Sequence, residues 1–553
     1  MTDTVFNKSV LRIDEKDNVM VALQNLQKGD VINRYEKEVV LQTNINAKHK
    51  FFIKDLHQGD EVIMYGVLIG TANQPIPAGG LMTTENVKHA ASKYSYKSSK
   101  YQWVPPDVLK FSGRTFNGYK RADGRVGTAN YWLFMPTVFC ENRNLDVIRE
   151  ALHNELGYAV TEKYKQYTHH LAECLKRGED LASSAGSFSL SSSQEVKRLF
   201  KNIDGIKFLN HQGGCGGTRQ DAAVLSKLLA SYADHPNVAG ITVLSLGCQH
   251  MQVQDFINDL KIRTPNFDKP LYIFEQQQSE SEEQLITGAI RKTFDGLIEI
   301  NKIERVPVPL NELCIGVKCG GSDGFSGISA NPAIGYTSDL LVALGGKVLL
   351  AEFPELCGAE QGLIDRCVDE GIANKFIKLM SDYDAMAHLD GSGFHMNPSP
   401  GNIKDGLITD AMKSAGAAKK GGTAPVSDVL NYTEPATKPG LSLVCTPGND
   451  VEATTGKAAS GATLILFTTG LGTPTGNAVA PTIKIATNSA LAKRMADIID
   501  IDTGPIISAE KTIEQMGEEI LEFCIKVASG EIIPKAVLLN QDDFIPWKRG
   551  VSL

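Results

Sequence analysis

The chain has 553 residues, a formal net charge of −8, and 22% charged residues. An acidic balance argues against a nucleic-acid surface, which needs a basic face. No apolar stretch approaches the roughly 18 residues of a membrane span, and the first residues lack the basic and apolar layout of a signal peptide. We therefore expect a cytoplasmic protein with a small-molecule partner and without nucleic-acid or membrane partners. The length predicts about two to four domains.

The cysteines indicate the redox environment. The ten cysteines are dispersed along the chain rather than framed like a small secreted scaffold. This usage favours a reducing compartment with free or metal-binding thiols. Chains of this size with long polar loops often associate, so we expect a homo-oligomer, with a dimer as the simplest form.

The N-terminal part, residues 1–90, is predicted to be a small β-rich domain. Short apolar runs such as Val19 to Leu23 are bounded by Gly-Asp turns at Gly29 and Gly59. Residues 91–115 are rich in Ser, Lys, Tyr and Pro, which predicts an extended linker.

From residue 116 the pattern changes to alternating strands and helices. Tyr131 to Val138 has the composition of a buried strand, and Leu145 to Leu156 has helical apolar spacing. This alternation predicts an α/β catalytic part with mostly parallel sheets. We place a second α/β domain at 116–275 and a C-terminal α/β domain at 276–553. Residues 390–424, rich in Gly, Ser, Asn and Lys, are predicted to be a long active-site loop.

Two Cys-Gly-Gly turns occupy the same local setting. Cys215 and Cys319 each follow a short apolar run and precede a stretch with helical spacing, and a second apolar run then leads to Cys248 or Cys357. The repeated pattern indicates a possibly duplicated α/β unit. Turns at the carboxyl ends of strands are where open α/β sheets bind ligands.

Cysteines at predicted strand ends are candidates for a site. Cys140, Cys215, Cys248 and Cys319 are presented there, whereas an ordinary cysteine is a small buried hydrophobe. No C-x-x-C pair is present, which argues against a zinc ribbon or a thioredoxin motif. The four thiols could converge on an iron centre or line a pocket.

Other candidate groups lie near these turns. A lone histidine is usually structural, but His211 is four residues before Cys215, and His250 is two after Cys248. The polar turns beginning at Asn397, Thr446 and Thr468 offer hydroxyls and N–H groups for a carboxylate or sugar hydroxyls. The cations best placed to bind an anionic substrate are Arg121, Arg125 and Arg219.

Several motifs, in order, resemble the altronate/galactarate dehydratase family of sugar-acid dehydratases. They are Ala47-Lys-His-Lys50 in an SAF-like N-terminal domain, the run Gly118 to Tyr131, the run Cys319 to Ala333, Pro398 to Gly406, Thr446 to Asp450, and Phe467-Thr-Thr-Gly470. The match runs nearly from end to end.

The chain departs from the family pattern at four places. The family's V-H-x-H-N turn is reduced to Asn86, Leu471 replaces the arginine of Thr-Thr-Gly-Arg-Gly, Met412 precedes Lys413-Ser414 in place of glutamate, and Cys445 replaces an aspartate. These changes from polar to apolar side chains bear on substrate choice and metal ligation.

The resemblance implies loss of water from a 2,3-dihydroxy acid: the proton α to the carboxylate is removed, the β-hydroxide is expelled, and the enol becomes a 2-keto-3-deoxy acid. The substrate implied is altronate, from galacturonate breakdown, giving 2-keto-3-deoxygluconate. The enediolate charge requires a metal or clustered donors; the family implies Fe(II), with Mn(II) as an alternative.

The resemblance also suggests roles for individual residues. The predicted catalytic residues are His49, His211, Cys215, Cys319 and Asp323. The predicted substrate-binding residues are Arg121, Arg125, Arg219, Thr468, Thr469, Asn402 and Lys413. The predicted metal ligands are His49, Asn86, Cys215 and Cys248.

Three alternatives stay open from the sequence. The chain could act on another hydroxy acid, such as galactarate or sulfolactate. It could be a non-catalytic sugar-acid-binding homologue, since it lacks two family motifs. It could be an iron–sulfur dehydratase, which would be a brown protein.

Overall fold

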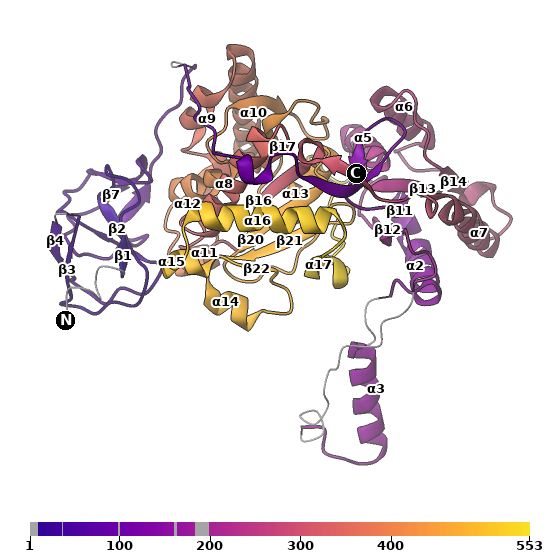
Figure 1. Ribbon diagram of the computed structural model, residues 1–553, viewed down its shortest axis with the longest axis horizontal. Coiled ribbons are helices and arrows are strands. Elements are labelled where there is room, and N and C mark those ends of the chain that lie inside the picture. Colours follow the sequence, from indigo (N-terminus) through magenta and orange to yellow (C-terminus); the bar gives the residue numbers. More distant parts are fainter. Residues whose placement is uncertain (1–8, 36, 98–99, 160–162, 183–197) are drawn as a thin grey trace.

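A computed structural model describes residues 9–35, 37–97, 100–159, 163–182 and 198–553. Figure 1 shows the β-rich N-terminal domain on one side, a large α/β unit in the centre and a smaller α/β unit on the other side. None of the helices in these described ranges has both the length and the apolar character needed to cross a membrane.

In the part that the structure describes, the N-terminal domain consists of strands and turns. It contains an antiparallel sheet in the order β1-β2-β5, the hairpin β3-β4, and an antiparallel sheet in the order β6-β7-β8. The strands are β1 (Val10–Leu11), β2 (Val19–Ala22), β3 (Val31–Arg34), β4 (Lys37–Val40), β5 (Lys50–Phe52), β6 (Glu61–Met64), β7 (Val67–Ala72) and β8 (Val87–His89). The prediction of a β-rich N-terminal domain is confirmed.

The smaller α/β unit has a parallel sheet in the order β12-β11-β13-β14. Its elements are β11 (Tyr131–Pro136), α2 (Asn142–Leu156), α3 (Lys163–Lys176), β12 (Gly205–Phe208), α5 (Arg219–Asp234), β13 (Val238–Ser245), α6 (Val253–Arg263), β14 (Leu271–Glu275) and α7 (Glu282–Ile300). A separate antiparallel sheet links it to the large unit, in the order β10 (Val126–Gly127), β9 (Thr115–Lys120), β15 (Val306–Pro309).

The large unit has a seven-stranded parallel sheet in the order β18-β19-β17-β16-β20-β21-β22. Its strands are β16 (Cys314–Cys319), β17 (Lys347–Ala351), β18 (Val426–Leu430), β19 (Gly440–Val444), β20 (Leu464–Thr469), β21 (Thr482–Ala486) and β22 (Ile501–Asp502). Its helices include α8 (Ala330–Ala343), the short helix η5 (Phe353–Leu356), α9 (Glu360–Arg366), α10 (Glu370–Leu389), α11 (Pro400–Lys404), α12 (Asp410–Ala418), α13 (Asp450–Ala459), α14 (Ser489–Arg494), α15 (Gly504–Ile507), α16 (Ile513–Ala528) and α17 (Lys535–Leu538). The predicted α/β class with mostly parallel sheets is confirmed.

Both Cys-Gly-Gly turns connect a strand to a helix, as predicted, but the two sheets use these strands differently. In the small sheet β11 lies between β12 and β13, whereas in the large sheet β16 and β17 are direct neighbours. The repeated sequence pattern therefore extends to the order of elements along the chain and not to their order in the sheet.

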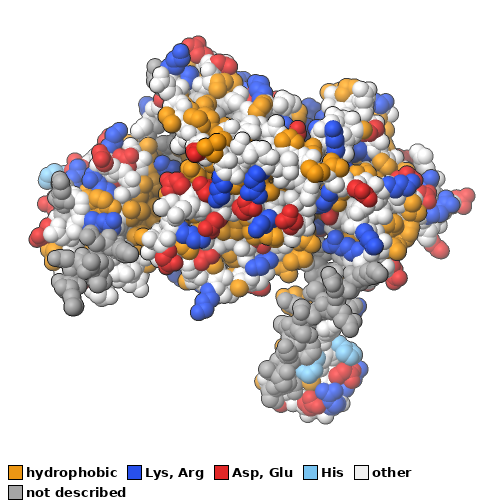
Figure 2. Space-filling model, viewed as in Figure 1, with side chains coloured by type: hydrophobic (Ala, Val, Ile, Leu, Met, Phe, Trp, Pro, Cys, Tyr) orange, Lys and Arg blue, Asp and Glu red, His pale blue; other side chains and the backbone are white. Residues whose placement is uncertain are grey.

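The N-terminal domain packs on the large unit through one shared apolar cluster. Phe52 and Tyr65 contribute from the N-terminal side, and Phe325, Leu407 and Met412 from the large unit. Met412 is fully buried there, so the apolar residue that replaces the family's glutamate stabilises this domain contact. On the face shown in Figure 2, acidic and basic side chains are interspersed.

Residues 390–424 differ from the predicted long loop. They contain α11 and α12, and a capping box at Ser399 and Asn402 starts α11. Their Gly, Ser and Lys content does not predict helices. The two short helices are stabilised by capping and by burial against the N-terminal domain.

Candidate active site

The candidate active site lies where the strand order of the large sheet reverses. After β16 the chain builds β17, β18 and β19 on one side and then crosses to add β20 on the other. Such a switch point opens a crevice at the carboxyl ends of the two diverging strands. The Cys319-Gly-Gly turn ends β16 there, and the Gly320 N–H donates to the Thr468 carbonyl at the end of β20 (2.9 Å).

A buried glutamate joins the lysines at this edge. Glu352 follows β17 with a left-handed backbone (φ 75°), a strained conformation for a non-glycine residue. One carboxylate oxygen pairs with Lys318 Nζ, and the other accepts from Lys420 Nζ at 3.0 Å. All three side chains are almost completely buried. A charged network buried this deeply is costly unless each charge is paired, and here the charges pair with one another.

Cys319 lies between this network and a second ion pair. Its Sγ is 2.7 Å from Lys420 Nζ and 3.7 Å from Glu355 Oε2. Glu355 also accepts from Lys413 Nζ at 2.9 Å. Burial by itself would raise the pKa of Glu355, but Lys413 and the neighbouring lysines hold it well below its usual value. Glu355 is therefore an anion across the neutral range.

Lys457, on α13, is the unusual member of the cluster. Its Nζ is completely buried, has no hydrogen-bond partner among the described residues, and lies 3.9 Å from Glu352 Oε2. Burial lowers the pKa of Lys457 well below its ordinary value, and the charges of Lys318 and Lys420 lower it further. Burial and the neighbouring ammonium groups thus favour the neutral amine form of Lys457, the form that is able to accept a proton.

The N-terminal domain reaches the same edge with a short lysine-rich segment. Lys48 Nζ is 3.0 Å from the buried carboxylate of Asp323, and Lys50 Nζ donates to the Gly406 carbonyl at 2.7 Å. Burial lowers the pKa of Lys50 to about 7. His49 lies between them, half-buried, and burial and Lys50 lower its pKa. His49 and Asp323 are thus brought to the same contact between domains.

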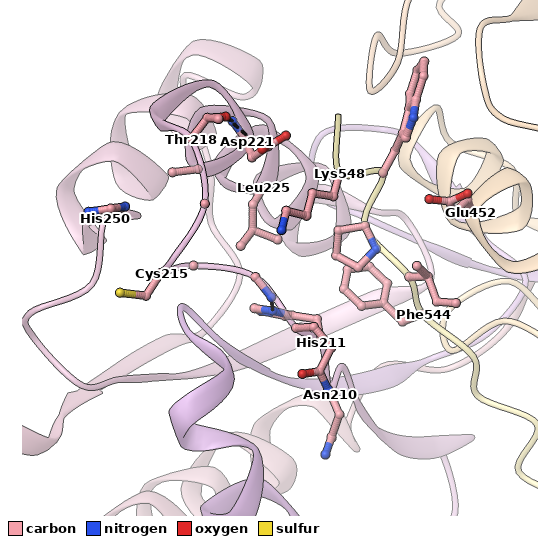
Figure 3. Close-up of a pocket in the computed structure, with 18 residues that line it drawn as sticks. Asn210, His211, Cys215, Thr218, Asp221, Leu225, His250, Glu452, Phe544 and Lys548 are labelled. Carbon is pink, nitrogen blue, oxygen red and sulfur yellow. Dashed lines mark hydrogen bonds between the residues drawn. The ribbon is translucent and has the colours of Figure 1, made fainter. Parts of the chain in front are cut away.

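The first Cys-Gly-Gly turn lines a separate cavity of about 410 Å³ in the smaller unit. Figure 3 shows Cys215 and His250 on one side of this pocket, Phe544 on the other and Lys548 between them. The C-terminal segment closes the pocket: Asp221 accepts from the N–H groups of Arg549 and Gly550.

His211 has no free ring nitrogen in this pocket. Nε2 lies 2.9 Å from the Pro136 carbonyl, and Nδ1 accepts from the Gly213 N–H at 3.1 Å. Burial lowers the pKa of His211 to about 4. The ring is thus neutral at ordinary pH and holds the turn in shape.

The predicted arginines lie away from the crevice and are engaged elsewhere or exposed. Arg121 is buried and donates to the Pro236 carbonyl and to Asn130. Arg125 pairs with Asp234, and Arg219 is exposed at the start of α5.

The other predicted substrate-binding residues lie around the Cys319-Gly-Gly turn and its charged cluster. The hydroxyl of Thr468 donates to Asn331, and that of Thr469 accepts three backbone N–H bonds that shape the turn after β20. Asn402 donates to the Ser322 carbonyl at 2.8 Å. Lys413 is part of the charged cluster.

The predicted metal ligands are distributed over two domains. Asn86 holds the turn before β8 through Thr83 and Leu81, and Cys248 is exposed after β13. Among the described residues, two groups of three ligand atoms lie within 4.8 Å of one another: Cys319 with Glu352 and Glu355, and His89 with Cys357 and Asp410. In the first group lysines already neutralise both carboxylates, so its residues do not fit a divalent ion without displacing a lysine.

Sequence reasoning missed most of the charged cluster. Lys318 and Glu352 stand at the ends of β16 and β17, and polar residues at strand ends were the available signal. Lys420 lies in a short 3-10 helix after α12, and Lys457 lies on α13. Neither belongs to a motif of its own, so their position could not be predicted from local sequence.

Comparison with known proteins places the chain in a family. Residues 8–90 match the altronate/galactarate dehydratase SAF domain, 118–301 the second domain of D-galactarate dehydratase/altronate hydrolase, and 310–552 the C-terminal domain of D-galactarate/altronate dehydratase. The chain is 32% identical to altronate dehydratase of Bacillus subtilis over 99% of this chain and 100% of that protein. It is 33% identical to altronate dehydratase of Escherichia coli (98% and 99%) and 30% identical to galactarate dehydratase (L-threo-forming) of Escherichia coli (94% and 93%). The chain therefore belongs to the altronate/galactarate dehydratase family.

Proposed function

We propose that this chain is a sugar-acid dehydratase that converts D-altronate to 2-keto-3-deoxy-D-gluconate in hexuronate breakdown, with its chemistry at the lysine cluster around Cys319. The observation that carries the proposal is Lys457, a fully buried amine without a hydrogen-bond partner among the described residues, beside three ion-paired lysines. Two relatives named altronate dehydratase, each similar over nearly its whole length, favour altronate over galactarate.

Lys457 is proposed as the base that removes the proton from C2 of the sugar acid. A base must be unprotonated when it acts, and burial favours the unprotonated form of Lys457 by lowering its pKa. The resulting enediolate carries negative charge, and the ammonium groups of Lys318 and Lys420 lie within the same buried network to stabilise it.

The departing C3 hydroxyl requires a proton donor, and the pair of Lys420 and Cys319 supplies one. As the C3–O bond breaks, the hydroxide takes a proton from the Lys420 ammonium and leaves as water. A C2–C3 double bond has then formed, and this enol gains a proton at C3 and loses the proton of its C2 hydroxyl to become the 2-keto-3-deoxy acid. Glu352 contacts both Lys420 and Lys457, so it can pass the proton gained by Lys457 back to Lys420.

The substrate enters between loops that are partly open to solvent. Asp450 has a side chain 29% exposed and pairs with Lys318 at 2.9 Å, and Asn397 accepts from Lys413 at 2.8 Å. We place the substrate carboxylate at Lys413 and Asn397 because both can exchange their present partners for it. The catalytic and binding roles predicted for His49, His211, Cys215 and Asp323, and for the arginines, stay predictions.

The proposal extends to location, assembly and metal. Ten free cysteines support a reducing cytoplasm, and a homodimer is the expected assembly, which light scattering can check. Iron(II), or manganese(II), is retained as the proposed cofactor; a bound divalent ion would supply Lewis-acid stabilisation of a carboxylate.

Purified chain supplied with iron(II) should be incubated with altronate and, separately, galactarate, with the 2-keto acid product identified by mass spectrometry. The expected result is turnover of altronate with a higher kcat/KM than for galactarate. A preference for galactarate would reassign the substrate. Absence of turnover with both, in chain of verified fold and metal content, would support the non-catalytic alternative instead.

A further inference from the structure

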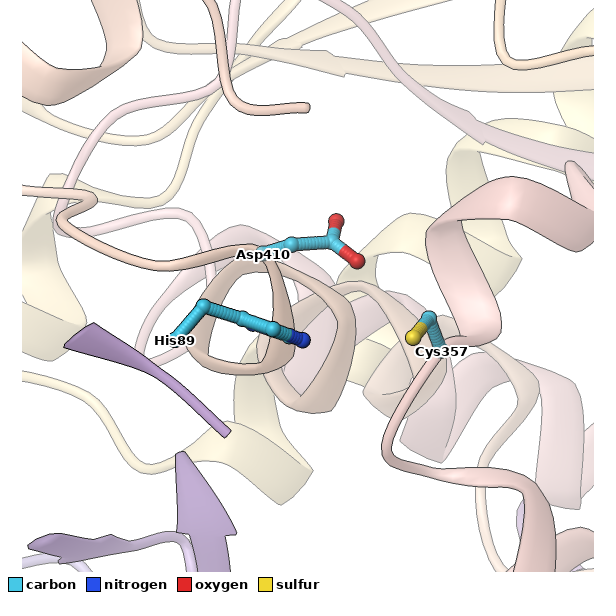
Figure 4. A group of neighbouring side chains, drawn as sticks. All are labelled: His89, Cys357 and Asp410. Atoms are coloured by element: carbon cyan, nitrogen blue, oxygen red, sulfur yellow. The ribbon is translucent and has the colours of Figure 1, made fainter. Parts of the chain in front are cut away.

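Three side chains from three separate segments converge at the contact between the N-terminal domain and the large unit. His89 ends β8, Cys357 follows η5, and Asp410 begins α12. One ligand atom from each lies within 4.8 Å of the other two. Figure 4 shows the imidazole, the thiol and the carboxylate directed toward a common space.

The backbone holds these segments close together. Gly358, next to Cys357, has a left-handed backbone (φ 89°), and a side chain there would contact Ala411 at 3.0 Å and Ala91 at 3.4 Å. Ala411 follows Asp410, and Ala91 is two residues after His89. The close approach of these three segments therefore fixes the positions of all three candidate ligands.

The carboxylate of Asp410 has few of the partners that a buried anion requires: the Ser414 hydroxyl donates one long hydrogen bond to its Oδ1 atom (3.5 Å). The residue is fully buried, and no hydrogen bond of ordinary geometry reaches its Oδ2 atom from the described residues. Burial raises the pKa of Asp410 to about 8, which the thiol of Cys357 and the charge of Lys413 only partly oppose. An uncompensated buried carboxylate is costly, and a bound cation would remove that cost.

The surroundings of this group are acidic, in contrast to the lysine cluster. Glu360 and Asp384 act on Cys357 as additional negative charges. Lys413, whose charge acts on Asp410, is already paired with Glu355. His89 makes one long hydrogen bond, 3.4 Å from the Ala411 N–H. The group thus presents ligands without a lysine that neutralises them.

We propose that His89, Cys357 and Asp410 form a binding site for one borderline divalent transition-metal ion, such as iron(II) or zinc. One imidazole, one thiolate and one carboxylate suit these ions and disfavour magnesium and calcium, which prefer oxygen ligands. Three protein ligands leave a fourth position open for water or another ligand. The predicted ligands His49, Asn86, Cys215 and Cys248 take no part in this site.

The site would link domain docking to the lysine cluster. Glu355 lies in η5 and the ligand Cys357 follows this helix directly. The ligand Asp410 and Lys413 lie one turn apart on α12. Each of the two elements therefore carries one proposed ligand and one member of the ion pair Glu355–Lys413. A metal bound here would fasten the N-terminal domain to the elements that position this pair.

Cobalt(II) binding to the full-length chain, stripped of metal with a chelator, tests the proposal without any substrate. Cobalt is chosen because a thiolate ligand produces a charge-transfer band in the near ultraviolet. The expected result is one tightly bound cobalt per chain with this band. C357S should lose the band, and C319S, the matched control from the lysine cluster, should keep it. H89Q and D410N should each weaken binding by more than the about 10- to 100-fold that loss of a supporting group costs.

Two results would overturn the proposal. One is a band that C319S abolishes and C357S retains, which would move the metal to the lysine cluster. The other is failure of the wild-type chain to bind cobalt. Circular dichroism verifies the fold of each variant, and H89Q, which retains both thiols, keeps the test decisive should C357S be unstable. Because binding is read from absorbance, loss of dehydration with intact cobalt binding would contradict only the proposed function.

Discussion

The two Cys-Gly-Gly turns share their local sequence pattern but differ in what surrounds the thiol. Around Cys215 the side chains are tied to the backbone: both ring nitrogens of His211 are engaged and Asp221 holds the C-terminal segment. Around Cys319 buried charges contact one another, and Lys457 has no hydrogen bond to any residue that the structure describes. A turn pattern thus locates a strand end, whereas unbalanced buried charge distinguishes the site that can transfer protons.

The largest expected difference between the turns is in catalysis. K457M removes the proposed base, so kcat for altronate should fall by about 10²- to 10⁴-fold. K548M removes a lysine from the Cys215 pocket and should change kcat little. In the wild type, kcat/KM should rise with pH as Lys457 loses its proton and becomes a base, and the residual activity of K457M should lack this rise. Equal losses in the two variants would break the comparison.

Charge-neutralising substitutions in the two regions should also lower thermal stability by different amounts. E352Q leaves the buried ammonium groups of Lys318 and Lys420 facing a neutral amide, and breaking a buried ion pair costs about 3–5 kcal/mol. D123N removes a partly exposed partner of Arg125 in the smaller unit, where such pairs contribute about 0–1 kcal/mol. Calorimetry should therefore show a much larger fall in Tm for E352Q. A Tm for E352Q equal to that of the wild type would contradict the buried network.

Lowering the pH should reduce the stability of the fold through His211, which lies in the first turn. Its pKa is about 4 in the folded chain and about 6.5 when unfolded, so the unfolded state binds more protons between these values. The contribution of His211 to the free energy of unfolding is therefore fully present above about pH 6.5. It is lost as the pH falls toward 4, by up to about 3 kcal/mol. H211Q should flatten the fall in Tm over this window. H250Q, at an exposed histidine, should leave the slope unchanged, and an unchanged slope in H211Q would exclude His211 as its source.

The smallest expected effect concerns specificity at the second turn. Leu471 is 40% exposed and faces the Gly321 turn. L471R adds a cation at the edge of the crevice and should raise kcat/KM for galactarate, a dicarboxylate, by roughly tenfold, because a charged hydrogen bond contributes about 1.5–3 kcal/mol. L389R, on the exposed end of α10, is the control. Equal kinetics for L471R and the wild type would place Leu471 outside the binding region.

The parts of the fold that follow from local pattern could be predicted. The strand at Tyr131 and the helix that ends at Leu156 were recognised from apolar spacing, and the Gly-Asp turns indicated the β-rich domain. Residues 390–424 were wrongly predicted to be a loop because short helices depend on capping and tertiary burial. Composition alone does not reveal either.

The site was predicted only in part, for a physical reason. Cys319 and Lys413 were identified, but the other members of the cluster, Lys420, Glu355 and Lys457, come from separate elements. Only the parallel sheet brings those elements to one edge. Charge balance in a buried cluster is a property of the assembled fold and leaves no short-range signal in the sequence.

Hydrogen exchange of backbone amides, measured by mass spectrometry with and without 2-keto-3-deoxygluconate, tests most directly where the chemistry occurs. The product should occupy the crevice and slow exchange in residues 319–324, 447–452 and 469–473. Segments 211–218 and 544–550, which line the Cys215 pocket, should exchange at unchanged rates. Protection confined to those two segments would contradict the assignment of the active site to the second Cys-Gly-Gly turn.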